Sequence, residues 1–252
     1  MSPIICPVCN EVCSLLDAVD FNKSCGVHGV QVTLAGIPIY YAHCARCGFC
    51  FAPEFSAWSP EDFMTRIYND EYIIFDPEYI EHRPRESAAC LLSMFPKLPE
   101  SIRHLDYGSG NALLGKILRE SNWNSTDYDP LVNRGLRIDS LGRFDLITAF
   151  EVFEHVPDIR KLISDLRLLL APGGIILFST LLSDGKIHAN QRLTWWYAAP
   201  RNGHISLFSR NSLSILAQEC HWNFGSFSDA FHIFFSSIPP PPYADHLIRT
   251  NR

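Results

Sequence analysis

The stretch LDYGSGN, residues 105–111, decides the fold of this chain. It predicts an acid, Asp106, at the end of a buried strand and two glycines, Gly108 and Gly110, where the strand turns into a helix. Glycine lets the backbone approach a ligand closely, and the first amides of a helix have no partners within it. The turn alone is a weak signal, because a tight strand–helix connection without a ligand uses the same residues.

The segments around this turn alternate between strand and helix patterns. Residues 103–107 and 144–150 are typical of buried strands, and IILFST at 175–180 is another. Residues 112–120 and 158–170 repeat apolar side chains at helical spacing. This order predicts an α/β fold with a Rossmann-like, doubly wound parallel sheet.

Four ordered motifs carry a resemblance to a known family. They are LDYGSGN, YDP at 128–130, FDLITAFEVFEHVPD at 144–158 and LLLAPGGIILFST at 168–180. In this order they resemble the class I methyltransferases that use S-adenosylmethionine. The resemblance covers about residues 100–215, and it implies the class I methyltransferase fold and methyl transfer from that cofactor.

The resemblance also implies a set of cofactor-binding residues. In that family the acid and glycines of the first turn hold the methionine end and ribose, and an acid after the second strand holds the ribose hydroxyls. Asp129 is the best match for this second acid, because a carboxylate accepts two hydroxyl donors at once, and Asp127 is the alternative. The residues implied at the cofactor are Asp106, Tyr107, Gly108, Gly110, Tyr128, Asp129 and Glu151.

Two positions depart from the family pattern. Ala112 stands where many relatives have a third glycine, which is a small change. Residues 130–143 are too few for the helix and third strand that the family usually has between Asp129 and Phe144, so this region must be shortened. The usual adenine-contacting acid therefore has no secure counterpart, and Asp139 is either that acid or an ordinary loop acid.

The segment EVFEHVPD, residues 151–158, contains candidate groups for orienting the methyl acceptor and removing its proton. It follows a buried strand at the carboxyl edge, where doubly wound sheets bind ligands. The resemblance implies that Glu151 faces the cofactor and the substrate. Glu154 and His155 are either acid–base groups or the architecture of a helix start. We predict Glu151 and His155 as catalytic residues, together with His204.

The late loop LTWWYAAPRNGHISLFS, residues 193–209, resembles the substrate loop of small-molecule methyltransferases. His204 matches a substrate-facing histidine there, and an unperturbed imidazole pKa of about 6.5 suits proton acceptance at neutral pH. In relatives that act on deoxysugars an acid precedes this histidine, whereas Gly203 stands here. The alternative is an aromatic loop packed around a core histidine. Further candidates are Trp195, Trp196 and Tyr197 as an apolar wall, Arg201 as an anion anchor, and Tyr72 and Tyr79 as caps over the cofactor.

Seven of the nine cysteines lie in the first fifth of the chain, which favours a metal site over disulfides in a reducing compartment. The spacings Cys6-x-x-Cys9 and Cys44-x-x-Cys47 are two zinc-ribbon knuckles that together complete a tetrahedral site of four cysteines. We predict a structural Zn²⁺ there, because four thiolates leave no open position for catalysis. The rival ligand set is Cys6, Cys9, Cys25 and His28.

Charge and composition exclude several other classes of function. The chain has 252 residues, with 21 Lys and Arg against 27 Asp and Glu and a net charge of -6. The acidic balance makes a nucleic-acid partner unlikely. No apolar run approaches the length of about 20 residues that spans a bilayer, and the start lacks a signal peptide. We therefore expect a cytoplasmic enzyme that acts on a small-molecule substrate.

A zinc module before a methyltransferase domain resembles the deoxysugar C-methyltransferases, which carry a further C-terminal domain that has no counterpart here. Two rival interpretations stay open. One is an rRNA or tRNA methyltransferase with a zinc knuckle, against which the acidic charge counts. The other is a non-catalytic zinc-ribbon binding protein with a vestigial methyltransferase fold, against which the intact set of acids and glycines counts.

The sequence also predicts how the chain divides into domains. We expect a zinc-ribbon module at 1–53, a helical linker or lid at 54–99, an S-adenosylmethionine-binding methyltransferase domain at 100–236 and a proline-rich tail at 237–252. The linker should begin with a helix, because Ser59 has the character of an N-cap before proline and two acids. In the tail, the run IPPPP predicts an extended surface segment.

Overall fold

The computed structural model describes residues 3–26, 32–236 and 239–249. The described residues form two compact units, each assembled from segments that are far apart in the chain. The first unit takes in Met1–Pro77, Phe153–Arg160 and Leu181–Leu216, and the second takes in Glu78–Val152, Lys161–Thr180 and Ala217–Arg252. The domain boundaries expected from the sequence follow chain order, and they stay a prediction.

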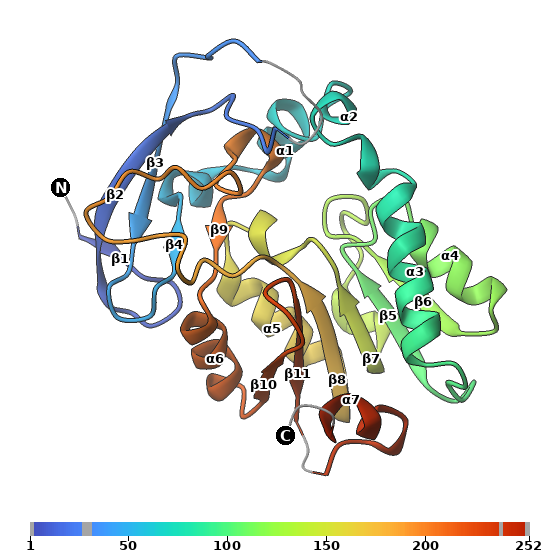
Figure 1. The fold of residues 1–252 in the computed structure, drawn as a ribbon. Helices are drawn as coiled ribbons and strands as arrows, with labels where there is room; N and C mark the ends of the chain where they lie inside the picture. The colour runs from blue at the N-terminus through green and yellow to red at the C-terminus, as the bar shows by residue number, and fades with distance from the viewer. Residues whose placement is uncertain (1–2, 27–31, 237–238, 250–252) are drawn as a thin grey trace. The chain divides into compact units, whose positions relative to one another are not determined.

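The second unit contains a six-stranded mixed sheet (Figure 1). Its strand order is β10-β11-β8-β7-β5-β6. The pairs β6–β5, β5–β7 and β7–β8 are parallel, whereas β11 runs antiparallel to both β8 and β10. The predicted Rossmann-like sheet is thereby confirmed, and the antiparallel strands β10 and β11 extend its β8 edge. The strands are β5 (Arg103–Tyr107), β6 (Asn124–Tyr128), β7 (Phe144–Ala149), β8 (Leu170–Ser179), β10 (Asn223–Ser226) and β11 (Phe231–Phe235).

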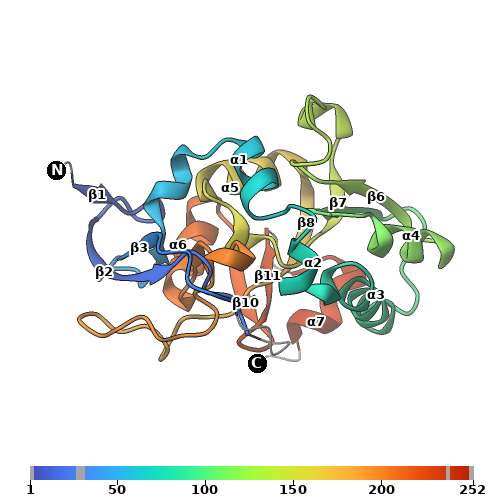
Figure 2. The ribbon, with the colours of Figure 1, turned by 90° about the horizontal axis from the view of Figure 1, so that it is seen from above.

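Helices cover both faces of this sheet. On one face, α3 (His82–Met94) and α4 (Leu113–Glu120) share a buried apolar cluster with alternate residues of β7, β8 and β11. On the other face lies α5 (Ile159–Leu169), where Asp165 accepts a hydrogen bond from Tyr107. Figure 2 shows α3 and α4 from above beside β6 and β7. Strand alternation thus separates the residues of β5 into two sets that face different helices.

The connection between β6 and β7 is short, as the sequence predicted. Residues 130–143 contain turns and the 3-10 helix η3 (Ile138–Leu141) in place of a helix and a third strand. Asp139 lies in η3 and forms an exposed ion pair with Arg137. This pairing is what an ordinary loop acid shows.

Part of the C-terminal segment departs from the expected extended tail. From the last proline of the run onward, η6 (Pro242–Ala244) and α7 (Asp245–Arg249) form, and Ala244 and Leu247 are buried in the core of the second unit. The proline run hides this helix from sequence reasoning, because apolar residues spaced over one short turn give a weak periodic signal.

The first unit is built around a second sheet, of order β1-β2-β3-β4-β9. The N-terminal strands β2 and β3 pair along most of their length, and β9 joins the sheet from the late loop by pairing with β4. The cysteine-rich segment and the late loop therefore share one sheet. The strands are β1 (Ile4–Ile5), β2 (Val12–Asp20), β3 (Pro38–His43), β4 (Cys50–Phe51) and β9 (Ser206–Leu207).

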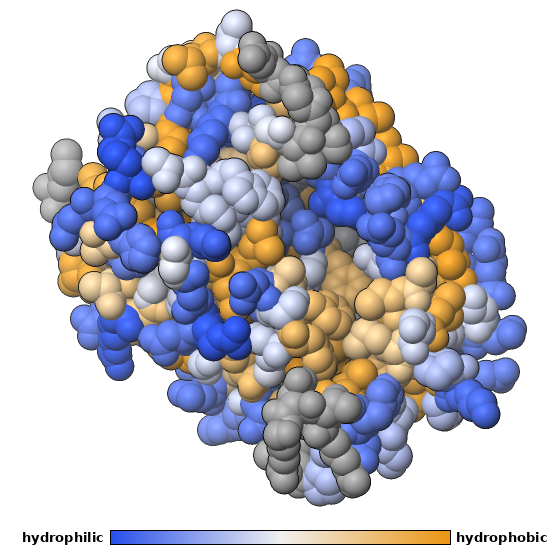
Figure 3. Space-filling model, viewed as in Figure 1, coloured by the Kyte–Doolittle hydropathy of each residue, from blue (hydrophilic) through white to orange (hydrophobic). Residues whose placement is uncertain are grey.

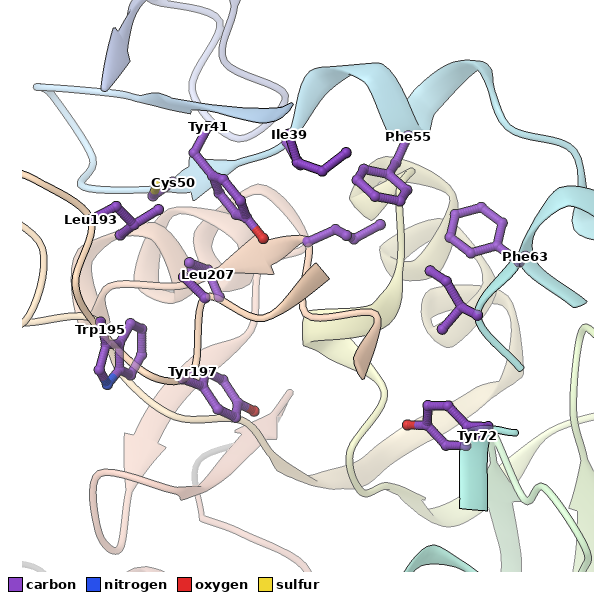
Figure 4. Close-up of a cluster of buried hydrophobic side chains, with 14 residues drawn as sticks. Ile39, Tyr41, Cys50, Phe55, Phe63, Tyr72, Leu193, Trp195, Tyr197 and Leu207 are labelled. Atoms are coloured by element: carbon purple, nitrogen blue, oxygen red, sulfur yellow. The ribbon is translucent and has the colours of Figure 1, made fainter. Parts of the chain in front are cut away.

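The same two parts of the chain share the apolar core of the first unit (Figure 4). Ile39 and Tyr41 from β3 pack in one buried cluster with Trp195 and Tyr197 from the late loop. Helix α1 (Pro60–Arg66) begins where the sequence predicts, because Ser59 and Asp62 form a capping box. The remaining helical segments are η1 (Pro53–Ala57), α2 (Tyr72–Phe75), η2 (Pro77–Tyr79), η4 (Phe153–His155), η5 (Pro200–Asn202) and α6 (Arg210–Glu219).

The surface carries dispersed apolar side chains among polar ones. Figure 3 shows hydrophobic and hydrophilic residues interspersed over one face. Val12 and Leu34 are among the exposed apolar residues, and scattered exposure of this kind is ordinary for folded proteins. Across the described part of the chain, no helix has the length and apolar character that crossing a membrane requires.

Candidate functional site

The glycine turn between β5 and α4 has the backbone that the sequence predicts. Gly108 and Gly110 have φ angles of +78° and +50°, in the left-handed region that favours glycine. A Cβ at Gly108 would lie 2.4 Å from Cγ2 of Val152, whereas a Cβ at Gly110 would meet nothing within 4 Å. The Gly108 amide donates to the Tyr128 carbonyl at 2.7 Å. Close packing thus requires glycine at 108, while the backbone at 110 borders open space.

Asp129 ties the end of β6 to this turn. One carboxylate oxygen accepts from the Gly110 amide at 3.0 Å, and the other accepts from the amides of Leu131 and Val132 at 2.8 and 3.2 Å. A carboxylate offers about four lone-pair positions, so the three amides leave room for about one more donor. Asp129 therefore has less capacity for ribose hydroxyls than its sequence position suggests. Asp127 pairs with Arg119 at 2.7 Å instead of facing the turn's amides.

Asp106 lies buried at the end of β5, with 4 % of its surface exposed. Burial raises the pKa of its carboxyl to about 7, and a hydrogen bond from the Thr148 hydroxyl, 3.0 Å long, opposes this rise. The neighbouring carboxylates of Asp127 and Asp129 raise the pKa as well. Asp106 is therefore poised to change its charge near neutral pH.

The side chains of Tyr107 and Tyr128 lie beside each other, and that of Tyr107 bonds to α5. The Tyr107 hydroxyl donates to Asp165 of α5 at 3.1 Å, and the two tyrosine rings lie 5.5 Å apart. Burial raises the pKa of both phenols. Of these two predicted cofactor residues, Tyr128 contributes its backbone carbonyl to the turn.

Glu151 is held in an unusual conformation after β7. Its φ of +52° is left-handed, which is rare for a residue with a Cβ and is typical of constrained functional positions. Ser179, at the end of β8, accepts from the Glu151 amide at 2.8 Å and donates to its carboxylate at 2.9 Å. Arg83 of α3 forms an ion pair with the other carboxylate oxygen at 3.1 Å. The side chain is thereby fixed in place at the carboxyl edge of the sheet.

In the first unit, the late loop holds His204 in a buried position. Its Nδ1 atom lies 3.0 Å from the Tyr197 carbonyl oxygen and 3.5 Å from the Cys25 sulfur. A carbonyl oxygen only accepts, so this contact assigns the hydrogen to Nδ1. The Nε2 atom of the neutral ring then carries a lone pair that can accept a proton.

His155 lies beside His204, and the two ring centroids are 4.9 Å apart. The Tyr68 hydroxyl lies 3.1 Å from Nδ1 of His155. Gly203 makes this packing possible, because a Cβ there would lie 2.7 Å from the Tyr68 hydroxyl and 2.9 Å from His155 Nδ1. The space that an acidic side chain would need at position 203 is therefore filled by Tyr68 and His155.

Glu154 completes this cluster of titratable groups. It is fully buried, and one of its carboxylate oxygens accepts a hydrogen bond from the Tyr197 hydroxyl. Ligand atoms of Glu154, His155 and His204 lie within 4.8 Å of one another, a set that could hold a metal ion as well as move a proton. These residues come from η4 and from the late loop, so only the folded first unit brings them together.

Other candidates of the late loop are part of the core. Arg201 is buried, donates to the Ile67 carbonyl at 2.9 Å and lies over the ring of Phe75, so groups of the first unit already contact its guanidinium. Trp195 and Tyr197 are buried in the apolar cluster of the first unit, whereas Trp196 is half exposed. Tyr72 is also buried there, and Tyr79 is exposed.

The two cysteine knuckles meet as the spacing predicts. The sulfurs of Cys6 and Cys47 lie 3.6 Å apart, those of Cys9 and Cys44 lie 3.4 Å apart, and all four lie within 4.8 Å of one another. Tetrahedral coordination with Zn–S bonds of about 2.3 Å requires sulfurs about 3.8 Å apart, so the four thiols fit a zinc ion. In the rival set, Cys25 contacts His204, and His28 lies outside the described residues.

A family model described as a methyltransferase domain matches residues 79–223, more than half of the chain. The chain belongs to the methyltransferase domain family. Its curated relatives include the ubiquinone biosynthesis O-methyltransferase of Colwellia psychrerythraea, 32 % identical over 85 residues that cover 34 % of this chain and 35 % of the relative. The enzyme of the same name from Azotobacter vinelandii is 28 % identical over 88 residues, or 35 % and 38 % of the two chains. The matched part of the chain thus spans little more than a third of either relative.

Among solved structures, the chain is similar to the 1,6-didemethyltoxoflavin-N1-methyltransferase of Burkholderia thailandensis. The two chains are 18 % identical, with a TM-score of 0.47, and the match covers 81 % of this chain and 96 % of the other. That structure holds 1,6-didemethyltoxoflavin and S-adenosylhomocysteine.

The sequence analysis did not identify four residues that contact the predicted site residues. Ser179 was within reach, because parallel neighbours β7 and β8 end at the same sheet edge as Glu151. No local sequence pattern predicts the contacts of Arg83, Tyr68 or Cys25, since each residue is far along the chain from its partner.

Proposed function

We propose that this methyltransferase transfers the methyl group of S-adenosylmethionine to a carbon or oxygen atom of a small molecule. The observation that carries the proposal is the turn at Gly108 and Gly110, whose amides donate to the Tyr128 carbonyl and the Asp129 carboxylate. This arrangement puts exposed backbone and a carboxylate at the carboxyl edge of the sheet, where doubly wound folds bind nucleotides. The family match covers the same residues.

The residues of the second unit fit this cofactor. When bound, S-adenosylmethionine supplies a methyl carbon that is already electrophilic. Asp129 would accept a ribose hydroxyl with its remaining lone pair, and Asp106 would balance the ammonium charge of the methionine end. Glu151, clamped by Arg83 and Ser179, would keep one fixed carboxylate for the cofactor or the acceptor.

In the first unit, His204 would act as the general base that deprotonates the acceptor. Its Nε2 atom would take the proton that the acceptor loses as the acceptor bonds to the methyl carbon and the sulfur–methyl bond breaks, because the hydrogen on Nδ1 goes to the Tyr197 carbonyl. His155 would assist from its position beside His204 and Tyr68. The assignment of His204, His155 and Glu151 as catalytic rests on these contacts and on their motif positions.

We also propose a structural Zn²⁺ held by Cys6, Cys9, Cys44 and Cys47. The side chains around the knuckles support a folding role: Ser209 bonds to the Cys47 carbonyl, and Arg160 bonds to the carbonyls of Pro7 and Val8. The ion would fix the strands that share a sheet with the late loop. Its thiolates require a reducing compartment, which supports a cytoplasmic location.

Calorimetry with S-adenosylhomocysteine, followed by methyl-transfer assays on phenols, catechols and nucleotide-linked sugars, tests the proposal. We expect binding at one site per chain and labelled product from at least one acceptor class. Transfer into tRNA or rRNA but into none of the small molecules would favour the nucleic-acid alternative. Absence of cofactor binding in zinc-loaded protein would favour the vestigial fold.

A further inference from the structure

A chain of four buried polar side chains crosses three neighbouring strands of the second unit and ends at Asp106. His104 of β5 is fully buried, with Nδ1 2.8 Å from the Ser125 hydroxyl of β6 and Nε2 3.0 Å from the Thr148 hydroxyl of β7. Thr148 in turn donates to the Asp106 carboxylate at 3.0 Å. His104 lies two residues before Asp106 on the same strand, so both side chains face the same side of the sheet.

The direction of these hydrogen bonds follows from what each group can donate. An ionised carboxylate only accepts, so the single hydroxyl hydrogen of Thr148 goes to Asp106. The Thr148 oxygen must then accept from Nε2–H of His104, and Nδ1 of the neutral ring accepts from Ser125. Burial, with a smaller effect of the nearby Arg119 charge, lowers the pKa of His104 to about 3, which keeps the ring neutral.

Asp106 needs this support because most of its surroundings oppose its charge. Burial raises its pKa most strongly, and the carboxylates of Asp127 and Asp129 add to that effect. Arg119 of α4 favours the ionised form, but it is already paired with Asp127. The Thr148 hydroxyl is the largest influence that favours the ionised carboxylate.

We propose that His104 is a positioning residue that commits the Thr148 hydroxyl to Asp106 and thereby sets the pH range in which the cofactor binds. This inference rests on the proposed function, in which Asp106 meets the ammonium group of the methionine end. Without the imidazole, the Thr148 hydroxyl can turn toward the Leu105 carbonyl, which lies 3.5 Å away. The carboxylate would then lose its donor, and its charge would be lost at a higher pH.

Titration of S-adenosylhomocysteine into the full chain by calorimetry, repeated from about pH 5.5 to about pH 9, tests the proposal. In the wild-type protein we expect affinity to fall as the pH drops through about 7. For His104→Leu and for Thr148→Val, we expect the midpoint to rise by about one pH unit or more, with about tenfold weaker binding at neutral pH. At high pH the affinities should converge on the wild-type value.

Two controls separate positioning from a general loss of structure. Thr126→Val changes a threonine of the neighbouring strand β6 and should leave the midpoint unchanged. If His104→Leu fails to fold, Thr148→Val still tests the bond that reaches Asp106. A uniform loss of affinity at every pH, with an unmoved midpoint in both variants, would overturn the proposal.

A second measurement needs no cofactor and so separates this inference from the proposed function. In protein labelled with ¹⁵N-histidine, the His104 ring should be neutral and protonated on Nε2 at about pH 8. Protonation on Nδ1 would reverse the hydrogen bond to Thr148 and refute the chain that we describe. Failure of every variant and of the wild type to bind S-adenosylhomocysteine, with the Nε2 tautomer present, would instead refute the proposed function.

Discussion

The Nδ1 atom of His204 lies 3.0 Å from the carbonyl oxygen of Tyr197, a contact that puts the hydrogen of the neutral imidazole on Nδ1 and its lone pair on Nε2. His204→Ala should therefore lower turnover by about 10²–10⁴, the range for a lost general base, with unchanged affinity for S-adenosylhomocysteine. His155→Ala should cost less. The exposed His188 offers a matched control, since His188→Ala should leave turnover unaffected. Full turnover by the His204 variant would contradict its assignment.

Asp129 joins the glycine turn to the end of β6 through three backbone amides. Asp129→Asn should weaken binding of S-adenosylhomocysteine by about tenfold or more, because an amide replaces charged hydrogen bonds of about 1.5–3 kcal/mol each. The exposed Asp229→Asn is the control for the change in net charge. Equal affinities of the two variants in calorimetry would exclude Asp129 from the cofactor site.

The four knuckle sulfurs should bind one zinc ion per chain. Cys44→Ser should release it and expose the first-unit strands to hydrogen exchange, because the coordination energy stabilises that fold. Cys90→Ser, which changes an exposed cysteine on α3, should retain the metal. Elemental analysis that finds zinc in Cys44→Ser but none after changes at Cys25 and His28 would move the site to the rival ligand set.

Gly203 permits the contact between Tyr68 and His155. Gly203→Ala should destabilise the protein and reduce turnover, because the new Cβ would overlap both side chains in a backbone with φ of +82°. Gly185→Ala isolates the backbone strain, since φ is +71° there and nothing lies within 4 Å. We expect this control to cost about 1–2 kcal/mol of stability without loss of turnover. If Gly203→Ala and Gly185→Ala had equal effects on urea unfolding and on activity, the contact between Tyr68 and His155 would have no role in either.

Asp106 should make the stability of the protein depend on pH. Its folded pKa of about 7 exceeds the unfolded value of about 3.9, so its stabilising contribution is full below about pH 3.9 and is lost as the pH rises through 7. Asp106→Asn removes this titration. As the pH rises from about 5 to about 8, the free energy of unfolding of the variant should therefore increase relative to that of the wild type by on the order of 2 kcal/mol. Urea unfolding at both pH values measures the difference. A pH-independent difference between the two proteins would show that Asp106 keeps an ordinary pKa.

The α/β sheet of the second unit could be predicted from local patterns in the sequence. Apolar runs and helical stripes act over a few neighbouring residues, so they predict β5, α4, β7 and α5 without any knowledge of distant partners. The glycine turn is equally local, because positive φ at Gly108 and Gly110 is a property of those residues. Even the shortened connection to β7 followed from counting residues.

Long-range packing, by contrast, sets which groups surround the predicted site residues. Strand β9 joins the cysteine-rich strands in one sheet, which brings Cys25 to His204 although the two are far apart in the chain. The contact between Tyr68 and His155 depends on packing between separate elements, and so does the chain of hydrogen bonds from His104 to Asp106. Such contacts are long-range, and local periodicity carries no information about them. The candidate site residues were predicted from the sequence, whereas the hydrogen bonds around them came from the fold.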